Sequence, residues 1–210
     1  MAASQPHCRL YLKLPARPPA ESSFLLAIAQ PVAYAGCVLL GGGDSADLDA
    51  PWAEHLAQFA HDRNVAFLVE GDVDLALKIG AEGVHIQADR ALYARARERL
   101  GPDAIVGAGC GQNRHDAMVM AELGADYIAF GPAPHNLDAK DDLAELIAWW
   151  SEIFVVPCVA FGASSAEEAS RIAALGADFV APADSLWQAP DGAKVLAEIA
   201  AVLAKPRSAA

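Results

Sequence analysis

The sequence predicts a single (β/α)8 barrel, because one short pattern occurs three times along the chain. Each copy has an apolar helical run, Gly-Ala, an acidic residue and a compact apolar strand, and the copies lie at 79–86, 123–130 and 175–182. Glycine just past a helix adopts the left-handed conformation that ends it, and a short apolar run is typical of a strand buried on both faces of a parallel sheet. Repeated helix-to-strand units therefore indicate a wound α/β fold.

The number of alternations selects the barrel among wound folds. Strands are predicted at 9–14, 36–40, 66–70, 84–86, 104–109, 127–130, 155–161 and 179–182. Helical patterns lie at 21–29, 51–62, 72–79, 91–100, 114–123, 142–153, 165–175 and 192–204. Eight alternations in 210 residues fit a closed barrel better than an open sheet.

Length and local signals support this assignment. A chain of 210 residues that is 54% hydrophobic can bury one large core, and no linker divides it. We expect the barrel to span 9–205, after a disordered or loosely held segment 1–8 and before a frayed tail 206–210. The serines at 164–165 precede two glutamates with the spacing of a capping box, which predicts a helix start there.

Composition excludes several classes of partner. The net charge of -12 disfavours the phosphate attraction that nucleic-acid binding needs. No apolar run approaches the roughly 20 residues that span a bilayer, and the N-terminus lacks the pattern of a secretory signal, so we expect a cytoplasmic protein. The four cysteines have no metal-ligand spacing and are expected to be reduced thiols. A homo-oligomer is left open.

In such barrels the loops that follow the strands carry the site. The small residues after strands seven and eight predict a phosphate site on backbone N–H groups, formed by Gly162, Ala163, Ser164, Ala183, Asp184 and Ser185. The alternative is structural: Gly162 makes only a tight turn, Ser164 only caps a helix, and Asp184 repels an anion. A small phosphorylated ligand is the expected partner.

Three charged residues near other strand ends are further candidates. Lys140 closes the loop after strand six and is able to clamp a diphosphate, unless it is only a solvated lysine among neighbouring aspartates. Asp72 and Asp89 follow adjacent strands and are able to share one Mg2+ with diphosphate oxygens. Both are equally placed as helix N-caps, which is the better interpretation for Asp72.

The nucleophilic and titratable side chains have mostly structural interpretations. His85 lies inside a predicted strand and is expected to be a hydrogen-bonded barrel residue. His135 is interpreted as a loop histidine, and Cys110, with no histidine in its loop, as an unreactive thiol.

Taken in order, several segments resemble the thiamine phosphate synthase and thiazole tautomerase superfamily. They are Val-Glu-Gly-Asp-Val-Asp-Leu-Ala-Leu at 69–77, Gly-Ala-Glu-Gly-Val-His-Ile-Gln at 80–87 with Asp89, Gly-Ala-Asp-Tyr-Ile-Ala-Phe-Gly-Pro at 124–132 and Gly-Ala-Asp at 176–178. The resemblance covers about 66–205. It implies a barrel in which Mg2+-bound diphosphate leaves an aminopyrimidine methyl group and a thiazole phosphate nitrogen traps the resulting cation. It also implies catalytic roles for Lys140 and Asp89, with Asp89 as a metal carboxylate.

The departures from this family fall in the loops. The family's Gln-x-Arg-x-Lys run at the second strand aligns with Leu-Leu-Gly-Gly-Gly at 39–43, so both diphosphate-binding cations are absent. The family's Asn-Asp pair after strand three aligns with Glu70-Gly71 in this chain. Its Ser-x-His after strand five aligns with Gly-Cys-Gly at 109–111. Thr-x-Thr-Lys survives only as 138–140, and a strand-eight serine is Ala181.

These departures leave three functions open. The chain is interpreted as a thiamine-phosphate-synthase-like barrel, with synthase activity expected to be absent or far below that of proteins with intact motifs, because a departing diphosphate needs several cations. A phosphate-ligand-binding barrel without synthase turnover is the first alternative. A thiazole tautomerase-like enzyme is the second.

Overall fold

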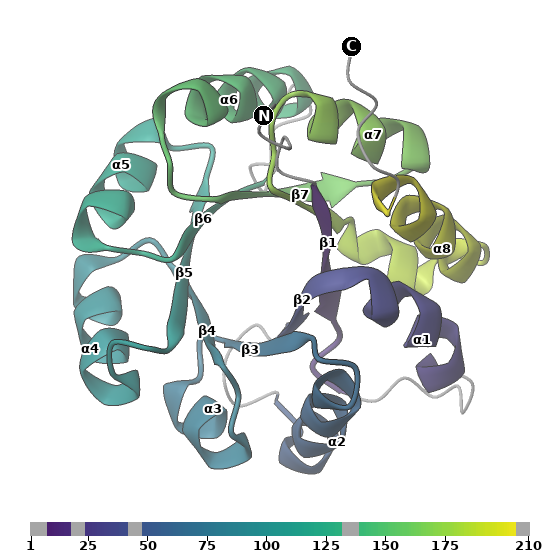
Figure 1. The fold of residues 1–210 in the computed structure, drawn as a ribbon, viewed down its shortest axis with the longest axis horizontal. Coiled ribbons are helices and arrows are strands. Elements are labelled where there is room, and N and C mark those ends of the chain that lie inside the picture. Colours follow the sequence, from purple (N-terminus) through teal and green to yellow (C-terminus); the bar gives the residue numbers. More distant parts are fainter. Residues whose placement is uncertain (1–7, 18–23, 42–47, 132–138, 205–210) are drawn as a thin grey trace, which may run out of the picture.

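The computed structural model describes residues 8–17, 24–41, 48–131 and 139–204, with side chains omitted at 139–142. Within these ranges eight parallel strands close into a barrel in chain order, and the helices surround it (Figure 1). The predicted (β/α)8 barrel is confirmed. Since all strands run the same way, their carboxyl ends meet at one rim, where the loops of interest lie.

The elements alternate without interruption. The strands are β1 (Arg9–Leu14), β2 (Ala35–Leu40), β3 (Ala66–Glu70), β4 (Gly83–Gln87), β5 (Ile105–Gly111), β6 (Tyr127–Phe130), β7 (Cys158–Ala163) and β8 (Phe179–Pro182). The helices are α1 (Phe24–Tyr34), α2 (Ala50–His61), α3 (Val73–Ile79), α4 (Arg90–Leu100), α5 (Arg114–Leu123), α6 (Ala139–Ile153), α7 (Ala166–Ala174) and α8 (Gly192–Leu203), and the short 3-10 helix η2 (Asp184–Gln188) follows β8.

Several predicted boundaries differ from the structure; helix α6, for example, begins at Ala139 rather than at 142. Strand β7 begins at Cys158 rather than at 155, because Val155 is 99% exposed and Pro157 has no N–H to donate to a neighbouring strand. Helix α1 continues through the buried Pro31 instead of ending at 29. Cys8 is 3% exposed and packs in the core, so it does not belong to a loose terminus. The rest of that terminus and the tail 206–210 lie outside the described residues.

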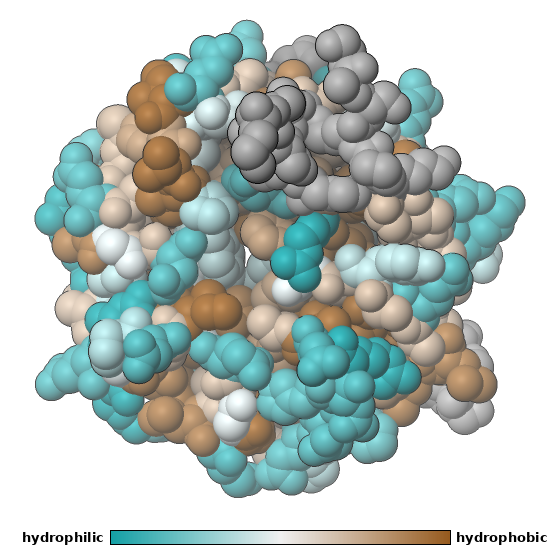
Figure 2. All heavy atoms as spheres, in the orientation of Figure 1, coloured by the Kyte–Doolittle hydropathy of each residue, from teal (hydrophilic) through white to brown (hydrophobic). Residues whose placement is uncertain are grey.

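Side chains alternate between the inside of the barrel and the helix layer. On β1, Leu10, Leu12 and Leu14 pack in the cluster shared with the helices, whereas Tyr11 belongs to the interior cluster. That interior cluster comprises Tyr11, Cys37, Leu39, Leu68, Tyr127, Ala129, Val159 and Ala181. Hydrophilic side chains dominate the outline of the face shown in Figure 2, with apolar ones between them. No helix of the described chain is both long and apolar enough to cross a membrane.

The acidic residue of each repeat has a structural role that is the same in all three copies. Glu82, Asp126 and Asp178 each accept the N–H of a residue on the preceding strand, at 2.7, 2.8 and 2.8 Å. Their own N–H groups donate to the carbonyl of that same residue, at 3.0, 3.0 and 3.1 Å. Each carboxylate therefore pairs an N–H at the base of the barrel that would otherwise lack a partner.

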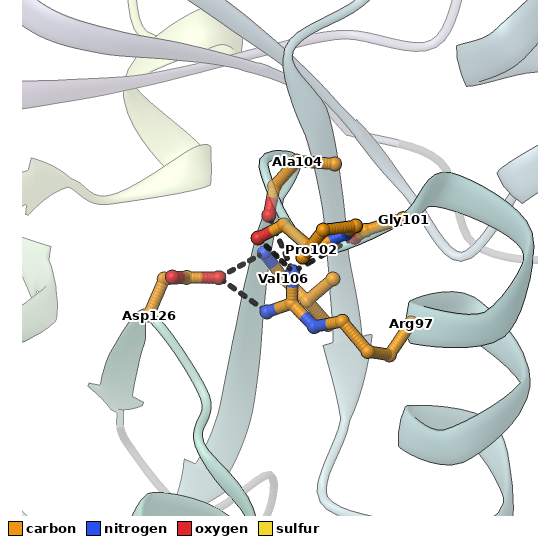
Figure 3. A network of polar contacts seen from close by, with 6 residues as sticks. All are labelled: Arg97, Gly101, Pro102, Ala104, Val106 and Asp126. Atoms are coloured by element: carbon orange, nitrogen blue, oxygen red, sulfur yellow. Dashed lines mark hydrogen bonds and ion pairs between the residues drawn. The ribbon is translucent and has the colours of Figure 1, made fainter.

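Asp126 also pairs with an arginine, and Figure 3 shows this network of contacts. Its Oδ2 accepts both the Val106 N–H at 2.8 Å and Arg97 Nη2 at 2.7 Å. Arg97 Nη1 also donates to the carbonyls of Gly101, Pro102 and Ala104 at 3.2, 3.3 and 2.7 Å. The guanidinium thus joins the end of α4 to the start of β5 and β6.

We predict that Asp126→Ala lowers the free energy of unfolding by about 1–3 kcal/mol, mainly because the Val106 N–H loses its acceptor. The ion pair with Arg97 contributes less, since it is partly exposed to solvent. Urea unfolding measures the change. Asp103→Ala, an exposed aspartate on the adjoining turn, is the control and should stay within about 0.5 kcal/mol of wild type; equal losses in both variants would contradict the role of Asp126.

Candidate functional site

Two adjoining cavities open at the carboxyl-terminal mouth of the barrel, with volumes of about 490 and 380 Å3. Both are lined by Lys13, Glu70 and Asp184. The larger is also lined by His85, Gln87, Gly109, Gly111, Ala129, Phe130, Gly131, Phe161, Gly162, Pro182, Ala183 and Ser185. The smaller adds Leu14, Pro15, Ala16, Gly41, Trp187 and Gln188. Strand ends from around the barrel therefore converge on one ligand-sized space.

The predicted phosphate loops reach this mouth only in part. Gly162, Ala183, Asp184 and Ser185 line the larger cavity. Ala163 is fully buried, and the N–H and hydroxyl of Ser164 both donate to Glu168, at 2.9 and 2.6 Å. Ser164 thus belongs to the start of α7, where Ser165 Oγ accepts the Glu168 N–H as the capping-box spacing predicts.

One further N–H in these loops is already engaged. Ala183 donates to the Ala163 carbonyl at 2.9 Å, which continues the pairing of β7 with β8. Gly162 has a φ of +107°, a conformation that glycine adopts readily, so its place at the rim is set by backbone geometry. The backbone donors left for an anion are fewer than the sequence suggests.

Lys13 is the residue at this mouth that sequence reasoning missed. Its Nζ lies 3.3 Å from a carboxylate oxygen of Glu70 and 3.3 Å from one of Asp184, with 23% of the side chain exposed. Burial disfavours its charged form, but the two carboxylates outweigh burial and raise the pKa of Lys13. The strict apolar alternation of β1 was the available signal, because it places Lys13 on the interior face one step above Tyr11.

A chain of polar side chains continues from the mouth into the barrel. His85 is 4% exposed, and its Nδ1 lies 2.9 Å from the Tyr127 hydroxyl, which lies 2.6 Å from the Tyr11 hydroxyl. Burial, with a smaller effect from Lys13, lowers the pKa of His85 to about 3, so the imidazole is neutral. Burial also raises the pKa of both tyrosines. The expectation of a hydrogen-bonded barrel histidine is confirmed.

The two aspartates considered as metal ligands both cap helices. Asp72 Oδ1 accepts the Leu75 N–H at 2.9 Å, and Asp89 Oδ1 accepts the Leu92 N–H at 2.8 Å. Among the described residues no group of three or more His, Cys, Asp or Glu side chains is placed to hold a metal ion. Mg2+ is commonly bound through one or two carboxylates together with substrate phosphates, so these two aspartates suit it as a cation shared with a phosphate ligand.

Of the remaining candidate residues, Cys110 has a buried side chain, and the side chains of Lys140 and His135 are not described. Cys110 is buried, and burial raises the pKa of its thiol to about 12, in keeping with an unreactive cysteine. Lys140 lies in the first turn of α6, but its side chain is outside the described part of the chain, as is His135.

The fold and its mouth define a (β/α)8 barrel with a candidate ligand site at the carboxyl ends of its strands. Residues 28–186 match the thiamine monophosphate synthase family, and the chain belongs to that family. This agrees with the resemblance carried by the segments at 69–89 and 124–132.

Relatives match over most of their length. The chain is 39% identical over 190 residues to the thiamine-phosphate synthase of Rhodospirillum centenum, covering 88% of this chain and 92% of the relative. It is 33% identical over 201 residues to that of Hyphomonas neptunium, covering 91% of each. The structure of thiamine phosphate pyrophosphorylase from Pyrococcus furiosus has a TM-score of 0.72 at 21% identity over 95% of this chain and 96% of that one, which shows the shared fold.

Proposed function

We propose that, contrary to the weak or absent activity expected from the loop departures, this protein joins an aminopyrimidine diphosphate to a thiazole phosphate, forming thiamine phosphate and releasing diphosphate. The observation that carries the proposal is the 39% identity to a thiamine-phosphate synthase across 92% of its length. In this reaction the C–O bond to the diphosphate breaks, and the resulting carbon cation is captured by the thiazole nitrogen. The enzyme's task is to neutralise the leaving group and stabilise the cation.

The two substrates are assigned in this proposal to different parts of the mouth. We assign the thiazole phosphate to the rim formed by Gly162 and Ala183–Ser185, where small residues permit close backbone approach. The neutral imidazole of His85 faces the same cavity from below, so it adds no positive charge that would repel a carbon cation. Lys140 is assigned to the diphosphate, as the family motif implies.

Asp89 is proposed as a carboxylate that holds Mg2+ together with the diphosphate, with Asp72 as a second one. When bound, the ion neutralises charge on the leaving group. Both aspartates also cap helices, so their metal role needs a test that leaves the caps in place.

We predict that Asp89→Asn lowers synthase turnover roughly tenfold or more while leaving stability nearly unchanged. Asparagine caps a helix as well as aspartate but lacks the charge that a metal carboxylate needs. The turnover should be measured against Mg2+ concentration, alongside thermal unfolding. Asp89→Ala is the matched variant and should also lose about 1 kcal/mol of stability with the cap. Unchanged Mg2+ dependence in Asp89→Asn would remove Asp89 from the metal site.

The competing function is a phosphate-ligand-binding barrel without synthase turnover. It is favoured by the two carboxylates that face Lys13, since they leave the described charges at the mouth net negative. Purified protein supplied with the aminopyrimidine diphosphate, thiazole phosphate and Mg2+ decides between them. Thiamine phosphate formed at an ordinary enzymatic rate supports the synthase, and no product contradicts it. Turnover of a thiazole tautomer precursor would favour the tautomerase.

A cytoplasmic location is part of this proposal, and the homo-oligomeric state stays open. Cys8, Cys37, Cys110 and Cys158 are all buried free thiols, which suits a reducing compartment. Light scattering during gel filtration measures the oligomeric state.

A further inference from the structure

The side chain of Lys13 occupies space that a glycine leaves open. A Cβ on Gly41 would lie 2.6 Å from Lys13 Cε and 3.1 Å from Lys13 Cγ. Any larger residue at 41 would therefore collide with the lysine as it stands. The family resemblance aligns Gly41 with the arginine of the Gln-x-Arg-x-Lys run, which reads Leu-Leu-Gly-Gly-Gly here. On that alignment, Lys13 of β1 brings a cation to the place where the loop after β2 lacks one.

The backbone at Lys13 is held in position by two hydrogen bonds. Its carbonyl accepts Trp187 Nε1 at 3.1 Å, and the next carbonyl, that of Leu14, accepts the Gly41 N–H at 2.7 Å. The end of β1 is held from both sides, so the amine projects into the mouth from a rigid base. The amine contacts residues from two other parts of the rim, Glu70 at the end of β3 and Asp184 after β8.

Lys13 supplies the positive charge among the described residues of the mouth. Among the described residues that line the two mouth cavities, Lys13 is the only lysine or arginine. A departing diphosphate needs cationic partners, and a lysine ammonium is a compact donor of up to three hydrogen bonds.

We propose that Lys13 binds the diphosphate of the aminopyrimidine substrate and so replaces the arginine that the family motif has at position 41. This inference rests on the proposed function for the identity of the substrate. The carboxylates of Glu70 and Asp184 hold the amine in the absence of ligand, and the diphosphate oxygens take over the amine when substrate enters.

The test compares variants by calorimetric titration with inorganic diphosphate and Mg2+, and by synthase kinetics. Lys13→Met roughly keeps the length of the side chain but removes its positive charge, and should weaken diphosphate binding roughly tenfold or more. The KM for the aminopyrimidine diphosphate should rise by a similar factor, whereas the KM for thiazole phosphate should stay unchanged. Lys13→Arg, which keeps the charge, should remain within about threefold of wild type.

A relocation variant makes the test specific to the exchanged position. Lys13→Ala combined with Gly41→Arg moves the cation back to position 41, and should recover at least half of the lost binding free energy. The control is Arg9→Met, because Arg9 lies on the same strand at the opposite end of the barrel. It should bind inorganic diphosphate as wild type does. Thermal unfolding checks that each variant is folded, and if Lys13→Met does not fold, the Arg and relocation variants carry the comparison.

The outcomes separate this inference from the proposed function. Wild-type affinity in Lys13→Met overturns the role of Lys13, while the synthase proposal stands if product still forms. Lys13-dependent diphosphate binding without turnover supports the inference and contradicts the synthase. Equal rises in both KM values would show a general loss of the site and overturn the assignment to diphosphate. A wild type that neither binds diphosphate nor turns over overturns both.

Discussion

Replacing Gly107 by valine is expected to destabilise the barrel by about 3 kcal/mol or more, because the new side chain has no space to occupy. A Cβ on Gly107 would lie 1.9 Å from Cζ and 2.1 Å from Cε1 of the Tyr127 ring. Displacing that ring would break contacts that stabilise the barrel interior. Its hydroxyl is hydrogen-bonded to Tyr11 and His85, and the Tyr11 ring packs edge-on against it.

Urea unfolding of Gly107→Val measures this effect, and two further variants establish its cause. Gly131→Ala is the control, since its Cβ would meet Phe161 Cβ at an ordinary 3.4 Å; it should change stability by less than about 1 kcal/mol. Combining Gly107→Val with Tyr127→Ala should cost less than the two single losses together, because the clash is removed. Strict additivity would show that the ring is not what excludes a side chain at 107.

Gly107 shows which features of the fold could be predicted from the sequence and which could not. The strand that contains it was predicted from local composition, but the reason for glycine lies on the next strand, in Tyr127, and depends on register. The acidic residues of the three repeats are similar. Their recurrence predicted the fold, yet their pairing with the N–H groups of the preceding strand follows only from how neighbouring strands align.

The candidate site shows the same division between local and long-range information. Capping by Ser165, Asp72 and Asp89 was visible in the sequence, because a cap and its helix are neighbours in the chain. The ion pairs of Lys13 join residues that are far apart in sequence, so composition and spacing did not reveal them. The alternation of β1 did place Lys13 inside the barrel, and reading it for polar as well as apolar positions would have found it.

The buried histidine is expected to make the protein acid-sensitive. Burial lowers the pKa of His85 from its ordinary 6.5 to about 3. Between these two values the unfolded chain binds a proton at this position and the folded chain does not. The contribution of His85 to the free energy of unfolding is therefore fully present above about pH 6.5. It is lost as the pH decreases toward about 3, by about 1.4 kcal/mol per pH unit.

We predict that His85 alone lowers the free energy of unfolding by about 2 kcal/mol between pH 7 and pH 5. Urea unfolding of wild type and His85→Gln at both pH values measures it, because glutamine keeps a hydrogen-bonding group for Tyr127 but does not titrate. The more exposed His55, His61 and His115 are present in both proteins, so the difference between the two profiles isolates His85. The variant should lose much less stability than wild type on acidification. Parallel profiles would mean that the folded protein accepts the proton at His85, and the neutral imidazole assigned to the mouth would then be wrong.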